Sequence, residues 1–399
     1  MQFLFRQIYK NSYLSSSFLS TNGFQSTFYH KHLQIERVAE DAKQCKPEGS
    51  ADQLQFGLHY SDHMMEVDWT ARDGWGRPVI CPLREIKLHP GAKVLHYAVE
   101  IYEGMKAFRG VDDRIRLFRP EMNMARMKKS AARAAMPDFD ADELLKVIIE
   151  LVRLDRDWVP AKSPASLYIR PTLIGTDPVS PVDPPRSVKM FVLTGPVGMY
   201  FAVTQPVSLY ADPSVVRAFP GGVGGFKMGC NYAPTIAVGE LASKYGCQQV
   251  LWLFGKDELL TEVGAMNIFI YWKNEIGEME LVTPPLDDGL IMPGVSRDSV
   301  LALAREWDEF RVVERYPSMR ELRRAIDEQR LFQIFGSGTA CAVSPVGRIL
   351  YREPGTGQME ELLIPTITSS AHVMQRLYKT ITDIQYGRVI RSDWTRTVA

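Results

Sequence analysis

A single lysine lies in a glycine-rich stretch near the middle of the chain. Residues 221–232 hold five glycines around Lys227 and end in Asn231 and Tyr232. Glycine lacks a Cβ atom, so a ligand or another segment of backbone can approach such a stretch closely. A buried lysine has a lowered pKa, and its free amine can form a Schiff base with an aldehyde. From spacing alone, a solvated lysine in a surface loop remains the simpler interpretation, because most lysines are exposed.

The stretch is not a phosphate-binding P-loop. Phe226 separates Gly225 from Lys227, and Met228 follows the lysine where a P-loop has Ser or Thr. Pyridoxal phosphate (PLP) is the common aldehyde cofactor that a lysine of this kind binds.

Further motifs accompany the lysine stretch in a fixed order along the chain. They are residues 95–97 with 102–108, residues 116–120 with 123–124, and residues 166–171, 260–264 and 335–341. With the lysine stretch, they resemble the branched-chain amino acid aminotransferases, which are PLP enzymes of fold type IV. The resemblance extends from about residue 56 to residue 394 and is strongest to the eukaryotic branch of that family.

The length of the chain and the resemblance predict the same organisation. A chain of 399 residues is too long for one typical core. The resemblance implies an α+β protein with a smaller N-terminal α/β domain and a larger, mixed, barrel-like C-terminal domain. We expect a transit peptide over 1–35, the small domain over 36–200, a connection over 201–215 and the PLP-lysine domain over 216–399.

Local patterns predict several elements. Pro120 suits the first turn of a helix from about Glu121, and residues 140–153 carry apolar side chains at helical spacing. A capping box at residues 318–321 begins another helix. Residues 166–174 read as a strand in which Tyr168 and Arg170 share one face, and residues 82–88 are a further strand candidate.

The resemblance assigns a cofactor site. Lys227 would bind PLP covalently and move the reacting proton, and Glu262 would keep the pyridine nitrogen protonated. Tyr232 would hydrogen-bond the cofactor phenolate. The remaining cofactor contacts are Arg126, the amides of Val295 and Ser296, the hydroxyl of Thr339, and Arg217. Without the family match, Glu262 and Arg126 would be ordinary surface charges.

The resemblance also assigns a substrate site, in which an apolar wall stands beside a few polar groups. A lone aromatic would more simply be core packing, but with the motifs a pocket is favoured. The wall comprises Phe56, Tyr97, Tyr102, Tyr168 and Tyr200, and the polar groups are Arg170 and the amide of Ala340.

The implied function is reversible amino transfer between L-leucine, L-isoleucine or L-valine and 2-oxoglutarate. The small-molecule partners are therefore amino acids and 2-oxo acids, and the implied assembly is a homodimer with Tyr97 near the partner subunit's site. Alternatives are a D-amino acid aminotransferase or an aminodeoxychorismate lyase of the same fold, or a non-catalytic binding protein. Retention of Lys227, Glu262, Arg126 and Tyr232 together argues against the last of these.

Two positions depart from the family pattern. Ala265 stands where many relatives carry Thr, so one hydroxyl near the cofactor is missing. Ser344 stands where vertebrate mitochondrial relatives carry the second cysteine of a Cys-x-x-Cys pair begun by Cys341. We therefore expect no redox switching by that pair, and Cys341 to be an inert buried thiol.

Composition limits the other functions. Positive and negative residues balance at 47 each, which gives no indication of nucleic-acid or membrane binding. The five cysteines lack metal-ligand spacing, so no metal site is expected. Residues 1–35 are basic, rich in serine and free of acidic residues. That composition is typical of a mitochondrial transit peptide, and it predicts location in the matrix.

Overall fold

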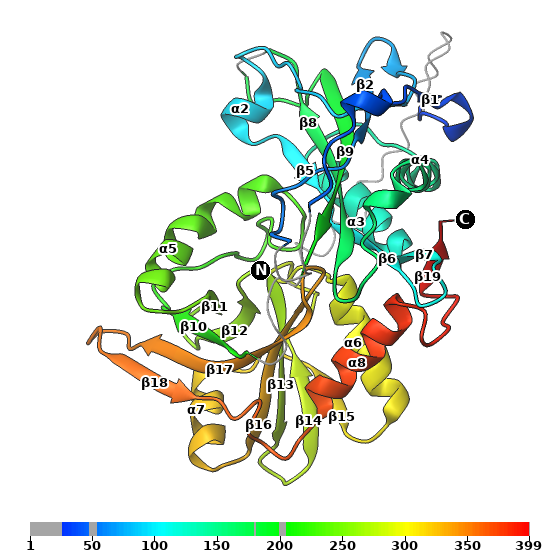
Figure 1. The fold of residues 1–399 in the computed structure, drawn as a ribbon. Helices are drawn as coiled ribbons and strands as arrows, with labels where there is room; N and C mark the ends of the chain where they lie inside the picture. The colour runs from blue at the N-terminus through cyan, green and yellow to red at the C-terminus, as the bar shows by residue number, and fades with distance from the viewer. Residues whose placement is uncertain (1–25, 48–53, 179–180, 199–204, 399) are drawn as a thin grey trace.

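The computed structural model describes residues 26–47, 54–178, 181–198 and 205–398. Two sheets organise them, one above the other in Figure 1. Tyr200, one of the residues expected in the substrate wall, lies outside the described residues.

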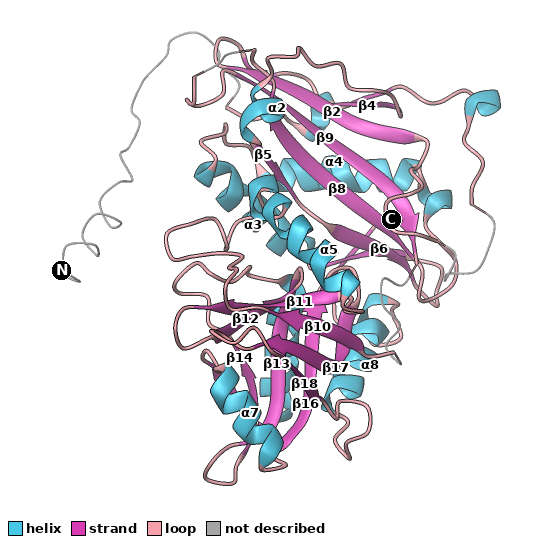
Figure 2. Ribbon diagram, turned by 90° about the vertical axis from the view of Figure 1, so that its left-hand side faces the viewer, coloured by secondary structure: helices cyan, strands magenta, loops and turns pink. Residues whose placement is uncertain are grey.

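The first sheet has ten strands, nearly all of them antiparallel neighbours. Two helices, α3 (Pro120–Arg133) and α4 (Ala141–Leu154), pack their apolar faces into the core beneath it (Figure 2). The strands are β1 (Gln34–Ile35), β2 (His63–Thr70), β3 (Gly74–Trp75), β4 (Val79–Pro82), β5 (Glu100–Tyr102), β6 (Met105–Arg109), β7 (Ile115–Phe118), β8 (Ser166–Gly175), β9 (Ser187–Val197) and β19 (Thr395–Thr397). Short helical pieces are η1 (His30–His32), η2 (Glu40–Ala42), α2 (Lys93–Tyr97) and η4 (Arg156–Trp158).

The second sheet closes on itself. The order β12-β11-β10-β17-β16-β13 ends with a pairing between β13 and β12, which makes a six-stranded barrel. Because β10 runs parallel to both its neighbours and the other pairs are antiparallel, the barrel is mixed, as expected. Its strands are β10 (Val207–Ala211), β11 (Gln249–Phe254), β12 (Leu259–Val263), β13 (Met266–Lys273), β16 (Leu331–Gly338) and β17 (Ala342–Arg352), extended by β14 (Met279–Thr283), β15 (Arg311–Glu314) and β18 (Met359–Leu363).

Helices cover this barrel on different sides. Helices α6 (Val295–Trp307) and α8 (Val373–Gln385) share a core with the outer faces of β13 and β16. Helix α7 (Met319–Asp327) packs with the barrel core. Helix α5 (Ile236–Lys244) follows two short turns of helix, η5 (Gly229–Asn231) and η6 (Ala233–Thr235), directly after the lysine.

Two helices that were predicted from local sequence patterns are confirmed. The Asp140 side chain accepts from the amides of Asp142 and Glu143 and so begins α4. Ser318 and Glu321 form the predicted capping box of α7, with both reciprocal hydrogen bonds present. These hydrogen bonds link residues at most three apart, and for that reason the sequence reveals them.

Three details differ from expectation. The strand expected over 82–88 lies instead at Val79–Pro82, and residues 83–88 form no regular element. Strand β10 lies within the segment expected to be a connection, and it pairs with β11 and β17. Strand β19 returns to the first sheet beside β7, where its red ribbon meets the cyan strand in Figure 1. The pairings of β10 and β19 join segments that are far apart in sequence, and local sequence patterns do not encode such pairings.

The described part of the expected transit peptide belongs to the first domain. Phe28 is fully buried against Trp75, with ring centroids 5.3 Å apart. The amide of His30 donates to Glu143 at 2.6 Å, and β1 pairs with β4. Because residues 27–35 make these contacts, a cleaved leader would have to end before Thr27.

Candidate active site

Lys227 and Tyr232 form the centre of the candidate site. The Lys227 Nζ atom donates to the Tyr232 hydroxyl at 2.7 Å, and it lies 5.1 Å from the centre of the Tyr102 ring. The backbone around the lysine is tied to the first domain. Tyr102 N donates to Lys227 O at 3.0 Å, and Lys227 N donates to the Ser130 hydroxyl of α3 at 2.9 Å. The lysine is therefore held where the two domains meet.

Close approach explains two glycines of the stretch. A Cβ atom at Gly224 would lie 2.6 Å from the carbonyl oxygen of Leu290, and one at Gly229 would overlap the Glu100 carboxylate. Any side chain at either position would displace these neighbours, because real Cβ contacts are never so short. The glycines therefore let the lysine segment pack between the loop before α6 and β5.

Arg126 lies in a buried ion pair. Its Nε and Nη2 atoms donate to the two carboxylate oxygens of Glu103, at 2.6 and 2.8 Å, and its Nη1 atom donates to Pro293 O at 3.0 Å. Asn123 donates to the same carboxylate at 2.9 Å. Glu103 is fully buried and was not among the predicted site residues, although it lies in the quoted 102–108 motif. These contacts fix the direction of the guanidinium.

Glu262 lies in a second buried ion pair. Its Oε2 atom is 3.1 Å from Arg217, and its Oε1 atom accepts from Asn267 at 3.1 Å and from the amide of Met292 at 2.9 Å. Burial raises the pKa of the Glu262 carboxyl, while Arg217 acts in the opposite direction. Arg217 also donates to Asn231 at 2.9 Å, so that this pair supports the lysine stretch as well.

The N-terminus of α6 lines the cavity that also contains Lys227. Val295 and Ser296 are the first residues of this 13-residue helix, whose free amides and dipole favour an anion. The hydroxyl of Ser337, near the end of β16, is buried there without a hydrogen-bond partner among the described residues, and Thr339 begins the turn that follows this strand. Together with Arg126, these groups can hold a phosphate.

The aromatic wall contains a cation. The rings of Phe56 and Tyr168 lie 4.5 Å apart. Arg170 donates to the Tyr168 hydroxyl at 2.9 Å, and its guanidinium lies 4.5 Å from the centre of the Tyr102 ring. Apolar and positively charged surfaces therefore lie side by side.

One cavity of about 270 Å³ unites most of the predicted residues. Glu262 and Arg217 line an adjoining cavity of about 220 Å³, and Gln249, Ala265, Met292 and Tyr232 line both. Tyr97 is 41% exposed at the end of α2 and does not line either cavity within one chain. The predicted residues in the first cavity are Phe56, Tyr102, Arg126, Tyr168, Arg170, Lys227, Tyr232, Val295, Ser296, Thr339 and Ala340.

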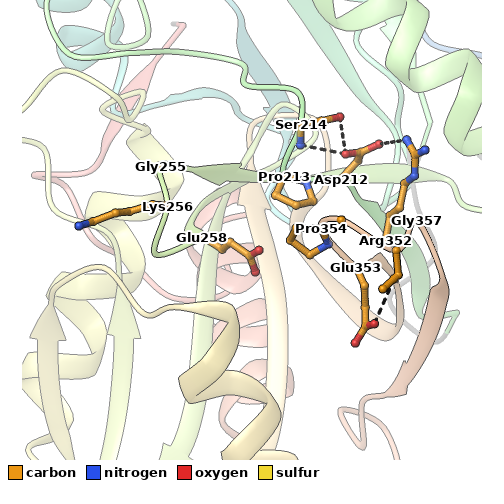
Figure 3. Close-up of a pocket in the computed structure, with 12 residues that line it drawn as sticks. Asp212, Pro213, Ser214, Gly255, Lys256, Glu258, Arg352, Glu353, Pro354 and Gly357 are labelled. Carbon is orange, nitrogen blue, oxygen red and sulfur yellow. Dashed lines mark hydrogen bonds and ion pairs between the residues drawn. The ribbon is translucent and has the colours of Figure 1, made fainter.

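Other parts of the described chain are weaker candidates for a functional site. A larger cavity, of about 610 Å³, lies between the turns that follow β10, β11 and β17 (Figure 3). Two of its charged groups pair with each other, since Asp212 accepts from Arg352 at 3.0 Å as well as from Ser214 at 2.6 Å. Among the described residues no three His, Cys, Asp or Glu side chains gather as metal ligands. No helix in the described ranges is long and apolar enough to cross a membrane.

The residues present fit PLP. A primary amine and an anion site at a helix N-terminus line one cavity, a buried carboxylate lines the adjoining cavity, and the Ser337 hydroxyl has no hydrogen-bond partner among the described residues. Cys341 contacts the Met266 sulfur from inside the wall, and burial raises the pKa of its thiol to about 11. A thiol that stays protonated at neutral pH agrees with the expected inert cysteine.

The sequence is similar to one family model and to several known proteins. Residues 100–349 match the model of the amino-transferase class IV family. The chain is 58% identical over 375 residues to the cytosolic branched-chain-amino-acid aminotransferase of Caenorhabditis elegans, covering 94% of this chain and 90% of that one. It is 50% identical to the mitochondrial branched-chain-amino-acid aminotransferase of Bos taurus over 364 residues, covering 91% and 90%.

Solved structures share the fold at lower identity. The PLP form of a branched-chain amino acid aminotransferase from Thermobaculum terrenum superposes with a TM-score of 0.63 at 20% identity, covering 86% of this chain and all of that one. At this identity the likeness speaks for the fold alone, and it confirms the predicted fold type.

Proposed function

The chain belongs to the class IV aminotransferases and, within them, to the branched-chain-amino-acid aminotransferases, and we propose that it transfers an amino group reversibly between L-leucine, L-isoleucine or L-valine and 2-oxoglutarate. The prediction of a PLP-dependent aminotransferase is confirmed by the family. The alternative activities considered from the sequence are not supported. One observation carries the substrate proposal: an apolar, cation-containing wall borders the cavity that holds the Lys227 amine.

Each polar group has one task in this proposal. Bound PLP supplies an electron sink for charge that develops at the substrate α-carbon. The Lys227 amine removes and returns the proton at that carbon, because it is the basic group of the cavity. The Tyr232 hydroxyl, 2.7 Å from this amine, orients it. Glu262 keeps a positive charge on the cofactor nitrogen, and Arg217 holds the carboxylate in place.

The remaining residues of the site bind either the cofactor phosphate or the substrate. Arg126, the amides of Val295 and Ser296 and the Thr339 hydroxyl hold the cofactor phosphate, with Glu103 as the support of Arg126. On the substrate side, Phe56, Tyr102 and Tyr168 exclude water and receive an aliphatic side chain. Arg170 and the Ala340 amide bind carboxylate groups. The same wall must therefore accept both a branched apolar side chain and the second carboxylate of glutamate.

A steady-state assay tests this proposal. The holoenzyme is given L-leucine and 2-oxoglutarate, and formation of 4-methyl-2-oxopentanoate and L-glutamate is followed by chromatography. Turnover with L-leucine, L-isoleucine and L-valine, none with D-leucine, and loss of all turnover in Lys227→Ala are expected. Turnover of D-amino acids in preference to L-leucine would overturn the substrate proposal.

Assembly and location are also part of the proposal. We propose a homodimer in which Tyr97 reaches the partner subunit's substrate site, because it is exposed and lies outside the cavity of its own chain. Light scattering of the purified enzyme tests the dimer, and Tyr97→Ala should raise the KM for L-leucine.

We further propose location in the mitochondrial matrix. The relatives include cytosolic and mitochondrial forms, and the basic, acid-free start of this chain supports the mitochondrial alternative. A fluorescent protein fused behind residues 1–26 should reach mitochondria, whereas a diffuse cytosolic signal would contradict the proposal.

A further inference from the structure

Lys106 is a buried cation without a carboxylate partner. It lies on β6 and is 8% exposed, and its Nζ atom donates to the carbonyl oxygen of Ala340 at 2.8 Å. Other buried cations of the described chain pair with acids: Lys93 lies 3.3 Å from Asp177, and Arg297 lies 2.6 Å from Glu314. No carboxylate of the described residues lies within ion-pair distance of the Lys106 ammonium.

An unpaired buried ammonium is costly, so its retention needs a reason. Removal from water disfavours the charged form, and a single carbonyl compensates only part of that loss. Around the candidate cavity, Glu103 balances Arg126 and Glu262 balances Arg217. Among the described residues, neither Lys106 nor Arg170 has a carboxylate within ion-pair distance, although Glu100 acts on Arg170 from farther away. This excess of positive charge favours the binding of negatively charged ligands.

The position of Lys106 connects it with the substrate wall. Ala340 lines the cavity between Thr339 and Cys341, and its carbonyl is the acceptor of the Lys106 hydrogen bond. In the sheet, Lys106 is directly opposite Tyr168, whose hydroxyl accepts from Arg170. The ammonium therefore lies behind the wall, between the turn of residues 339–341 and the strand that carries Arg170.

We propose that Lys106 is a positioning residue for the dicarboxylate partner of the reaction. It fixes the 339–341 turn through the Ala340 carbonyl, and its charge favours a substrate with a second carboxylate over one with an aliphatic side chain. This inference rests on the proposed function and adds a specificity determinant to it. Arg170 remains the group that contacts the ligand, while Lys106 acts through the turn and through its field.

The charge of Lys106 is expected to depend on pH. Burial lowers the pKa of Lys106 to about 8. From the facing turn, Cys341 stays neutral because burial raises its pKa to about 11. On β8, Tyr168 and Arg170 lie nearby, and on β7 Arg116 is paired with Asp112. The preference for a dicarboxylate should therefore weaken as the pH rises through about 8.

Binding of two unreactive acids to the holoenzyme tests the inference. Glutarate has two carboxylates and 4-methylpentanoate has one carboxylate and a branched chain. Calorimetry gives the Kd of each acid for the wild type, Lys106→Met and Lys106→Gln. A partly exposed residue of α3 that is paired with Asp138, Lys128, gives the matched control Lys128→Met.

The expected result is selective. Lys106→Met and Lys106→Gln should weaken glutarate binding about tenfold, a loss of about 1.4 kcal/mol, and change 4-methylpentanoate binding less than twofold. The KM for 2-oxoglutarate should rise in parallel, and its rise above pH 8 in the wild type should vanish in both variants. Lys128→Met should behave as the wild type.

Two results would overturn the inference. In the first, both acids lose affinity equally, which indicates a purely structural role. In the second, Lys106→Gln keeps the wild-type preference, which shows that the charge has no part in it. Failure of the proposed function is distinguishable, because the wild type itself would then not transfer the amino group of L-leucine.

Discussion

Arg126 and Glu103 face each other through two parallel hydrogen bonds, from Nε to Oε1 at 2.6 Å and from Nη2 to Oε2 at 2.8 Å. Both side chains are buried, and the guanidinium also donates to Pro293 O, next to the N-terminus of α6. Because the pair spans β5–β6, α3 and the loop before α6, it joins the two domains at the anion site.

Glu103→Ala should destabilise the protein strongly. Breaking a buried pair leaves the other charge uncompensated and typically costs about 3–5 kcal/mol. Urea unfolding of the variant should show this loss, together with weaker binding of added PLP. The matched control is Glu121→Ala on α3, which removes a solvent-accessible pair with Arg396 of β19 and should cost less than about 1 kcal/mol. Equal losses in the two variants would contradict the assigned support of Arg126.

Tyr232→Phe should slow the reaction without releasing the cofactor. The variant loses the hydroxyl that accepts from the Lys227 amine at 2.7 Å, while the ring remains. We expect kcat to fall by less than the roughly 10²- to 10⁴-fold that an acid–base group itself contributes, because the Lys227 amine remains and loses only its orienting partner. Tyr245→Phe, at an exposed residue directly after α5, is the control and should leave kcat unchanged. An unchanged kcat in Tyr232→Phe would exclude the orienting role.

Ala265→Thr should have a small effect. The Ala265 side chain faces both the 270 Å³ cavity and the adjoining one, so a threonine there adds a hydroxyl beside the cofactor site and narrows the passage. We expect a change in kcat of less than about tenfold, since a single added hydrogen bond contributes about 1 kcal/mol. Steady-state kinetics with L-leucine measures it. A loss of all activity would show that this chain depends on the smaller residue.

Lys106→Met should stabilise the folded protein at neutral pH. The folded pKa of about 8 lies below the ordinary value of 10.5, so the unfolded chain binds more protons between these limits. The unfolding free energy of the wild type should therefore rise with pH from about 8 to 10.5. The burial penalty is complete below pH 8 and corresponds to about 3 kcal/mol.

Urea unfolding at pH 7 and pH 10 measures this effect. The methionine variant should be more stable at pH 7 and lose the part of the pH dependence that Lys106 causes. If Lys106→Met gains stability and also loses the preference for a dicarboxylate, then Lys106 serves function at the expense of stability. A variant less stable than the wild type at pH 7 would instead mark Lys106 as structural.

Residues with a local or motif signal were predictable from the sequence. Lys227 is one example, since its glycine-rich surroundings and the motifs around it indicate both the cofactor and the fold. Glu103, Ser130 and Lys106 were missed as site residues, because their importance depends on partners 20 to more than 200 positions away. Likewise, β19 returns to β7 across almost the whole second domain. Such pairings are set by tertiary packing, which a single sequence does not display.

The most direct test of the central claim is single-turnover absorbance spectroscopy of the purified holoenzyme. L-leucine is added first and 2-oxoglutarate second, and the visible band of the lysine-bound cofactor is followed. The band should disappear with L-leucine and return with 2-oxoglutarate, whereas Lys227→Ala should show no such band. A band that L-leucine leaves unchanged would contradict the substrate claim, and a wild type without the band after addition of PLP would contradict the role of Lys227.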